Sequence, residues 1–161
     1  MRKILITICA VIFLFSSCKK EKSYLYDVNS VVVTQPGGAK PNLKNTEEFV
    51  SIAYSDLFGI GISHTDLLKI NLAYAAFGDK KLIEDMIIKN FLNDTGIVIP
   101  TSAAMRADVP AFTIASYKKF FNREPNSFET WFVGNAINAD TTITPVLVYY
   151  SFMTSNEYRY Y

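Results

Sequence analysis

Residues 45–58 read NTEEFVSIAYSDLF, a stretch that carries a helix start signal and a helical spacing of apolar residues. Asn45 and Glu48 form a capping-box pattern, in which each side chain accepts a hydrogen bond from the other residue's backbone amide. The apolar residues that follow share one face of a helix. They are Phe49, Ile52, Ala53, Leu57 and Phe58. The stretch therefore predicts an amphipathic helix that begins near Thr46.

The same signals predict five more helices farther along the chain. Ser63 and Asp79 are the expected caps of the second and third helices, and Asp108 and Asn126 are those of the fourth and fifth. Residues 140–142 open the last helix, whose first turn tolerates Pro145. The predicted fold class is all-α.

The predicted helices form two sets of three, and the first two helices of each set align at one offset. This offset places Phe49 on Phe112 and the cap Ser63 on Asn126. The last helix needs a two-residue shift, which brings Met86, Ile87, Phe91 and Leu92 onto Leu147, Val148, Phe152 and Met153. One set is too small to bury its aromatic faces alone. We therefore expect two related halves, residues 46–94 and 109–155, packed into one helical domain over 46–161.

Composition excludes several classes of function. The 161 residues include 16 basic and 15 acidic side chains, without the basic excess that a nucleic-acid-binding surface needs. Two cysteines and one histidine cannot supply a zinc site of cysteine and histidine ligands or a c-type haem attachment. We expect no metal, no cofactor and no nucleic-acid partner.

The first residues have the order of a secretory signal. Arg2 and Lys3 precede an apolar run over 4–15, which is too short to span a bilayer. Ser16-Ser17-Cys18 then resembles the bacterial lipobox, although Phe15 stands where leucine is preferred. The resemblance implies a signal peptide over 1–17, a lipidated Cys18 and a tether over 18–45. An ordinary signal peptide with a chance cysteine is the alternative.

The residues after Cys18 bear on location. No aspartate follows the cysteine, as it does in the inner-membrane retention signal of enterobacteria, so outer-membrane sorting is expected. The signal and the Ser-Ser-Cys-Lys-Lys run resemble those of Bacteroidota lipoproteins. In that group an acidic cluster after the cysteine marks surface export, and Glu21 stands alone among lysines. The periplasmic leaflet is therefore favoured over the cell surface.

The second half resembles the helical repeat domains of bacterial extracellular proteins that are similar to phycobilisome linkers. The shared features are the tyrosine helix and Arg-Glu-Pro corner over 117–125, Trp131, and the Ser-x-Glu-Tyr ending over 155–158. Asn122 replaces the glycine of that pattern. The resemblance implies an all-α scaffold that works through protein contacts, and it implies no reaction.

No set of residues forms a catalytic constellation. Ser63, His64 and Asp66 superficially offer a triad, but adjacent residues at a helix start point in different directions. Capping explains Ser63 and Asp66. Asp56, Glu84 and Asp85 are expected on solvated helix faces. We expect no catalytic residue and no enzyme activity.

Tyrosines gather at the C-terminus. Tyr149, Tyr158, Tyr160 and Tyr161 form a candidate interaction surface, because tyrosine is enriched in interface cores. A sugar-stacking platform is a second interpretation. The third is that Tyr150 packs in the core and the other tyrosines belong to a frayed tail.

Arg123 and Glu157 are predicted to form an ion pair. Both belong to the resembling pattern, and both are missing together from the first half, where Ile60 and Gly96 take their places. The planar fork of arginine suits a bidentate carboxylate contact.

These observations favour a lipid-anchored, non-enzymatic accessory or scaffold subunit of an outer-membrane protein complex. Its expected contacts are the membrane, through the lipid, and an outer-membrane protein partner. The alternative is a small envelope protein that binds glycan or another ligand through an aromatic surface or the groove between the halves.

Overall fold

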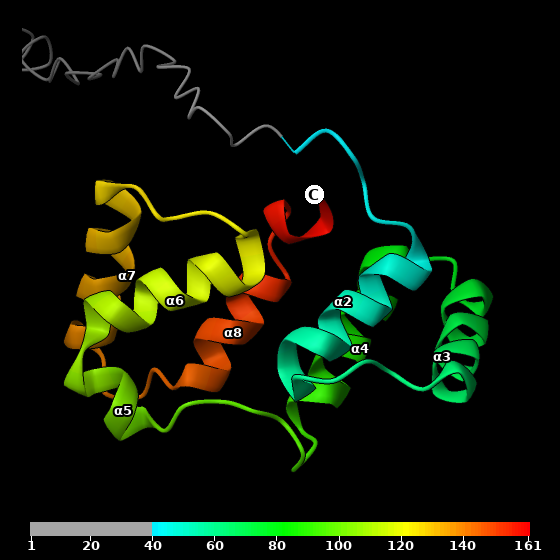
Figure 1. Ribbon diagram of the computed structural model, residues 1–161, viewed down its shortest axis with the longest axis horizontal. Coiled ribbons are helices and arrows are strands. Elements are labelled where there is room, and N and C mark those ends of the chain that lie inside the picture. The colour runs from blue at the N-terminus through cyan, green and yellow to red at the C-terminus, as the bar shows by residue number, and fades with distance from the viewer. Residues whose placement is uncertain (1–39) are drawn as a thin grey trace, which may run out of the picture. The chain divides into compact units, whose positions relative to one another are not determined.

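The computed structural model describes residues 40–161, and this part of the chain is helical, as predicted (Figure 1). It contains seven α-helices and no sheet. The helices are α2 (Thr46–Phe58), α3 (His64–Ala76), α4 (Lys80–Leu92), α5 (Ser102–Ala107), α6 (Val109–Phe121), α7 (Ser127–Ala139) and α8 (Pro145–Met153), followed by the 3-10 helix η1 (Glu157–Arg159). No helix among these residues is long and apolar enough to cross a bilayer.

The predicted caps hold the starts of α2, α3, α4, α6 and α7. The predicted start of the last helix at residues 140–142 is wrong, because α8 begins at Pro145 and Thr144 is its cap. The Asn45 side chain accepts from the Glu48 amide at 2.9 Å, and the Glu48 carboxylate accepts from the Asn45 amide at 2.8 Å. Asn126 and Glu129 make the same reciprocal pair at 2.8 and 2.7 Å. Each pair satisfies two amides that a helix start otherwise leaves without partners.

Two helices end in the same unusual backbone conformation. Gly59 after α2 has φ of 70°, and Asn122 after α6 has φ of 51°. Asparagine is one of the few side chains that adopt the left-handed region, which favours glycine. Asn122 therefore ends α6 in the same left-handed conformation in which Gly59 ends α2.

The helix bounds follow the offset found in the sequence. The offset that places Phe49 on Phe112 also places both ends of α2 and α3 on the corresponding ends of α6 and α7. The last residue of α4 falls on the last residue of α8 once the two-residue shift is applied. The turns that follow also correspond, because Asn93 donates to the Lys89 carbonyl as Thr154 donates to that of Tyr150. The first half, 46–94, and the second half, 109–155, thus share helix order and turn geometry.

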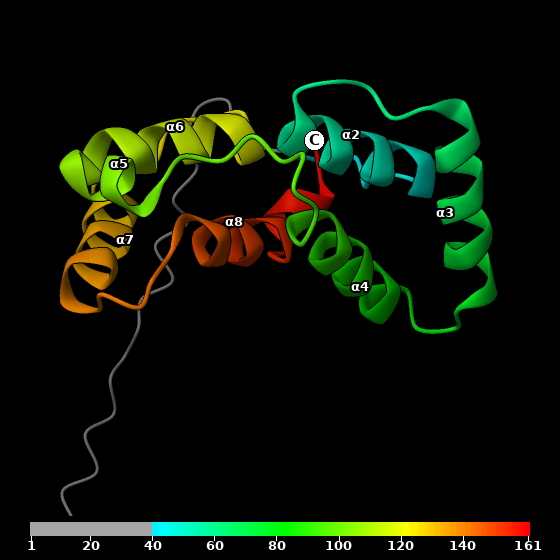
Figure 2. The same ribbon diagram turned by 90° about the horizontal axis from the view of Figure 1, so that it is seen from below.

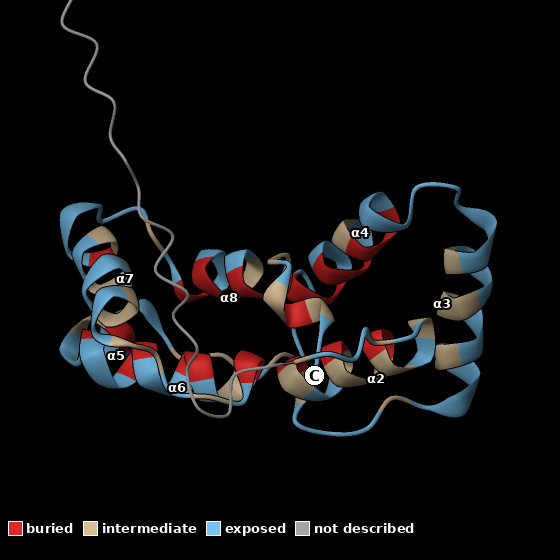
Figure 3. Cartoon of the chain, turned by 90° about the horizontal axis from the view of Figure 1, so that it is seen from above, coloured by how far each residue is buried: buried red, intermediate tan, exposed pale blue. Residues whose placement is uncertain are grey.

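The two halves meet where α4 packs against α8 (Figure 2). Buried side chains of both halves form one hydrophobic cluster, and Figure 3 shows the buried faces of α2, α4, α6 and α8. Tyr158 completes this core from η1 with no exposed surface. Its ring centroid lies 6.0 Å from those of Phe49 in the first half and Phe120 in the second.

Arg106 of α5 binds the backbone of the loop between α7 and α8. Its guanidinium donates to the carbonyls of Ile137, Asp140 and Ile143 at 2.6, 3.0 and 3.0 Å. Carbonyls at the end of a helix have no partner within that helix, and a cation there also complements the helix dipole. Helix α5, which lies in the connection between the halves, therefore stabilises the loop between α7 and α8 in the second half.

The described end of the predicted tether packs on the helical domain. Residues 40–44, here called the N-terminal strap, pack on the C-terminal segment, residues 154–161. Leu43 forms an antiparallel bridge with Tyr160, and the Lys44 amide donates to the Arg159 carbonyl at 2.9 Å. The partner of this extended chain is too short to show a strand pattern of its own. The predicted signal peptide, Cys18 and most of the predicted tether lie outside the described residues.

Candidate binding surfaces

The predicted tyrosine surface is wrong for two of its four members. Tyr149 and Tyr158 are buried, and a buried ring cannot line a surface. Tyr149 packs between Phe112 and Phe120, with ring centroids 6.1 and 4.7 Å apart. Tyr160 and Tyr161 are exposed.

The hydroxyls near the C-terminus bind carboxylates of the first half. Tyr158 donates to Asp56 at 2.7 Å, and Tyr150 donates to Asp85 at 2.6 Å. Tyr161 donates to Glu48 at 3.2 Å. These tyrosines therefore join the end of the chain to helices α2 and α4, across the boundary between the halves.

The expectation that Asp56, Glu84 and Asp85 lie on solvated faces is also wrong. Glu84 is buried, and it accepts from the Tyr74 hydroxyl at 2.9 Å and from Arg159 at 3.1 Å. Asp56 and Asp85 are half-buried. The side chains that cover all three come from distant parts of the chain, so helical spacing could not reveal them.

A buried charge network holds the N-terminal strap. The Lys44 ammonium lies 3.9 Å from the centroid of the Tyr158 ring and donates to the Tyr158 carbonyl. Burial lowers the pKa of Lys44 to about 8, and the nearby Asp56 carboxylate opposes this shift. Burial also raises the pKa of Asp56 above its usual value and that of Tyr158 well above 10.

We expect the free energy of unfolding to increase as the pH rises from about 8 to about 10. The unfolded chain keeps Lys44 charged up to its usual pKa of 10.5, whereas the folded chain releases that proton near pH 8. The unfolded state then binds more protons in this window, so stability increases with pH. Above about pH 10 the direction reverses, because folded Tyr158 keeps a proton that an unfolded tyrosine releases.

Urea unfolding at several pH values tests this. Lys44→Met keeps most of the aliphatic stem and removes the titration, so the rise above about pH 8 should be smaller in this variant. An equal rise in both proteins would assign the effect to another group.

The structure brings Arg123 and Glu157 together. Arg123 donates from Nε and Nη2 to the two oxygens of Glu157 at 2.7 and 2.8 Å. It also donates from Nη1 and Nη2 to both oxygens of Glu129, at 2.8 and 2.7 Å. Sequence reasoning assigned Glu129 only to the capping box and missed this second contact. The arginine lowers the pKa of Glu129 below its usual value.

His64 lies exposed at the first position of α3. Ser63 donates to the Asp66 carboxylate at 2.7 Å and accepts from the Asp66 amide at 3.1 Å. Both residues are therefore engaged in the helix cap. Within residues 40–161, no group of three or more histidine, cysteine or acidic side chains could hold a metal ion.

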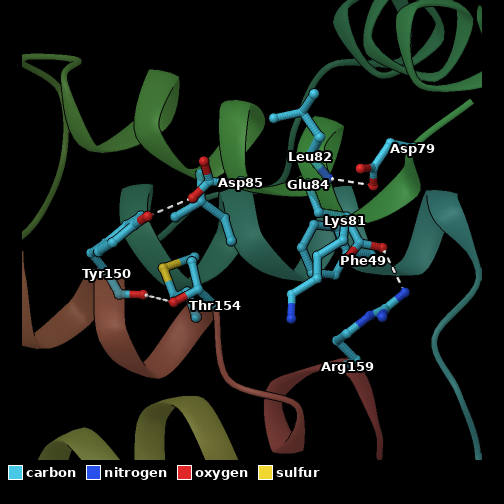
Figure 4. Close-up of a pocket in the computed structure, with 11 residues that line it drawn as sticks. Phe49, Asp79, Lys81, Leu82, Glu84, Asp85, Tyr150, Thr154 and Arg159 are labelled. Atoms are coloured by element: carbon cyan, nitrogen blue, oxygen red, sulfur yellow. Dashed lines mark hydrogen bonds and ion pairs between the residues drawn. The ribbon is translucent and has the colours of Figure 1, made fainter. Parts of the chain in front are cut away.

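A groove of about 640 Å³ opens between α4 and the C-terminal segment. Figure 4 shows Glu84 facing Arg159, and Asp85 facing Tyr150. Lys81 also lines the groove, together with apolar groups that include Ile88 and Met153. Donors and acceptors beside apolar walls suit a small polar molecule.

Among the described helices, α3 and α7 carry the large apolar side chains that are more than half exposed. On α7, Phe128, Trp131 and Phe132 are 66%, 61% and 58% exposed, whereas Ile137 of the same helix is buried. On α3, Leu68 and Leu72 are 51% and 75% exposed. Helix α3 has no fully buried residue. Helical periodicity identified these apolar residues but not which of them the fold would cover.

No protein-family model, curated protein or solved structure matches this chain. The likeness of the second half to linker-like repeats stays a prediction.

Proposed function

We propose that this protein is a lipid-anchored, non-enzymatic accessory subunit of an outer-membrane protein complex, and that it binds a protein partner along α3. The anchor is Cys18, and the favoured location is the periplasmic leaflet of the outer membrane. The single observation that carries the partner site is that α3 is apolar on two sides and covered on only one.

The inner side of α3 meets the rest of the first half incompletely. Leu67, Ile70 and Tyr74 are partly buried against the hydrophobic cluster. A cleft of about 460 Å³ remains between α2, α3 and α4, and Phe58 and Phe91 are among its lining residues. A helix with so little burial gains stability when another surface covers it.

The outer side of α3 has the composition of a protein interface. Leu68 and Leu72 lie one helical turn apart, and the exposed ion pair between Asp66 and Lys69 at 3.0 Å lies toward the cleft, which both of its residues line. An apolar centre with a polar rim is the usual arrangement at a protein interface. An apolar surface of a partner protein, with charged groups at its edge, fits this side.

The anchor gives the first test. Cys18→Ser should abolish acyl labelling with radiolabelled palmitate, because the thiol that receives the lipid is missing, and should leave the signal uncleaved by the lipoprotein pathway. The measurement is labelling and gel mobility of the wild type and the variant. Cys9→Ser is the matched control, because residue 9 leaves with the signal peptide. Unchanged labelling of Cys18→Ser would contradict the anchor.

Photocrosslinking in intact cells tests the partner. A photoreactive residue at Leu72 should give one discrete adduct with an outer-membrane protein, while the same residue at the exposed Ala111 on α6 should not. Identical adducts from both positions would contradict a partner site on α3.

The groove supports a second candidate, an envelope protein that binds glycan or another polar ligand. The observation in its favour is the buried Glu84 held between Tyr74 and Arg159 beside open volume. Retention on a glycan column without any crosslinked partner would favour this function. An Arg159→Ala variant that is retained equally well would exclude the groove as the binding site.

A further inference from the structure

The three rings on the outer side of α7 form a compact cluster of their own. The Phe128 ring centroid lies 5.8 Å from that of Trp131 and 6.0 Å from that of Phe132. We call Phe128, Trp131 and Phe132 the α7 aromatic cluster. Each such ring buries about 150–250 Å² when it is covered, so three together are a large apolar surface to leave in water.

Folding of the domain does not account for this surface. The opposite side of α7 packs on α6, and Ile137 enters the core there. The single charged side chain of α7 is Glu129, which is bound to Arg123. The outer side of α7 therefore carries three exposed aromatic rings, and the charge of Glu129, which follows Phe128, is paired with Arg123.

The chemistry of this side differs from that of α3. The ion pair beside the leucines of α3, between Asp66 and Lys69, is largely exposed, whereas the pair between Arg123 and Glu129 at the start of α7 is mostly withdrawn from solvent. Tryptophan and phenylalanine are the residues that amphipathic helices place at the boundary between lipid headgroups and acyl chains. A bilayer offers that boundary without requiring a matching charge.

The anchor brings a bilayer within reach. This step rests on the proposed function, because it takes Cys18 as the lipidated residue. The chain from Cys18 to Lys40 spans at most about 75 Å when fully extended. A helical domain of this size has a radius of gyration of about 14 Å, so the tether lets any of its faces meet the membrane.

We propose that the α7 aromatic cluster lies in the headgroup–acyl boundary of the membrane that carries the lipid anchor. The domain then has two attachments to the membrane, the lipid and α7. Helices α3 and α7 lie at opposite ends of the described part (Figures 1 and 2). Contact through α7 therefore leaves α3 directed away from the lipid, toward a partner.

Trp131 reports on its own position, because it is the single tryptophan of the chain. The natural lipoprotein is reconstituted in vesicles of phosphatidylethanolamine and phosphatidylglycerol, with and without bromine on the acyl chains. We expect the emission of Trp131 to shift to shorter wavelength in vesicles and to lose most of its intensity with brominated lipid. Equal intensity in both lipids would overturn the proposal.

Paired variants supply the control. Phe128→Ser with Phe132→Ser should restore much of the Trp131 emission in brominated vesicles, and both residues are exposed, so the fold should persist. Leu68→Ser with Leu72→Ser on α3 should leave the quenching unchanged. A shift to shorter wavelength that needs added outer-membrane protein, without quenching by brominated lipid, would assign the α7 aromatic cluster to a protein and overturn the proposal.

Vesicle flotation separates this inference from the proposed function. Protein that does not float with the vesicles contradicts the anchor and this inference with it. Protein that floats while Trp131 stays unquenched contradicts the lipid contact of α7 alone.

Discussion

Arg123→Ala should lower the free energy of unfolding by about 3–5 kcal/mol, because it leaves two carboxylates without their common partner. The Arg123 side chain is 17% exposed, and those of Glu129 and Glu157 are 22% and 33% exposed. Water can therefore replace only some of the hydrogen bonds that the guanidinium donates to the two carboxylates. Urea unfolding measures the loss.

A neighbouring ion pair gives the matched control. Lys118 and Glu124 lie 2.9 Å apart at the other side of the same corner, and both are largely exposed. Lys118→Ala should therefore cost less than about 1 kcal/mol. Arg123→Lys should recover only part of the stability, because an ammonium cannot form two bidentate contacts.

A double-mutant cycle identifies the pair itself. The losses from Arg123→Ala and Glu157→Ala should not add, since each variant removes the same contact. Additive losses would show that Arg123 acts through Glu129 alone.

Lowering the pH should reduce the free energy of unfolding of Arg123→Ala less than that of the wild type. The lowered pKa of Glu129 contributes stability that is present above its unfolded pKa and is lost as the pH falls through the folded pKa.

Tyr158→Ala should cost about 3–5 kcal/mol, the usual loss for removal of a fully buried ring. Tyr158 has no exposed surface and contacts rings from both halves. Tyr158→Phe separates the contribution of the buried ring from that of the hydroxyl. It keeps the ring and removes the hydroxyl that binds Asp56, so the expected loss is about 1–3 kcal/mol.

Tyr160→Ala is the control for Tyr158. The Tyr160 side chain is exposed, and its variant should unfold within about 0.5 kcal/mol of the wild type. Thermal and urea unfolding of the three variants measure these differences. A Tyr158→Ala protein as stable as Tyr160→Ala would contradict the assignment of Tyr158 to the core.

The sequence was informative wherever the structure depends on residues close together in the chain. The capping pairs at Asn45 and Asn126 act between near neighbours in the chain, and each marks the helix start found in the structure. The offset between the halves also agrees with the helix bounds, because caps and apolar spacing are local signals. Local signals alone therefore predicted α2, α3, α4, α6, α7 and α8 in their order, but not α5 or the start of α8 at Pro145.

Contacts between distant residues could not be predicted in this way. Tyr158 and Asp56 are 102 positions apart, and nothing in either neighbourhood identifies the other as its partner. Arg123 and Glu157 were an exception, because comparison of the two halves showed both residues missing together. The exposure of Trp131 also escaped sequence reasoning, since an apolar helix position looks the same whether a neighbour covers it or not.

The N-terminal strap has a mechanical consequence for an anchored protein. If Cys18 is held in a membrane, tension on the tether reaches the strap before it reaches α2. Asn42 and Lys44 hold the strap through three backbone hydrogen bonds to the last residues of the chain. Rupture of these bonds would lengthen the tether by the strap alone and leave the helices folded. In an anchored protein, the contact between the two ends of the described chain would therefore break under tension before the helices unfold.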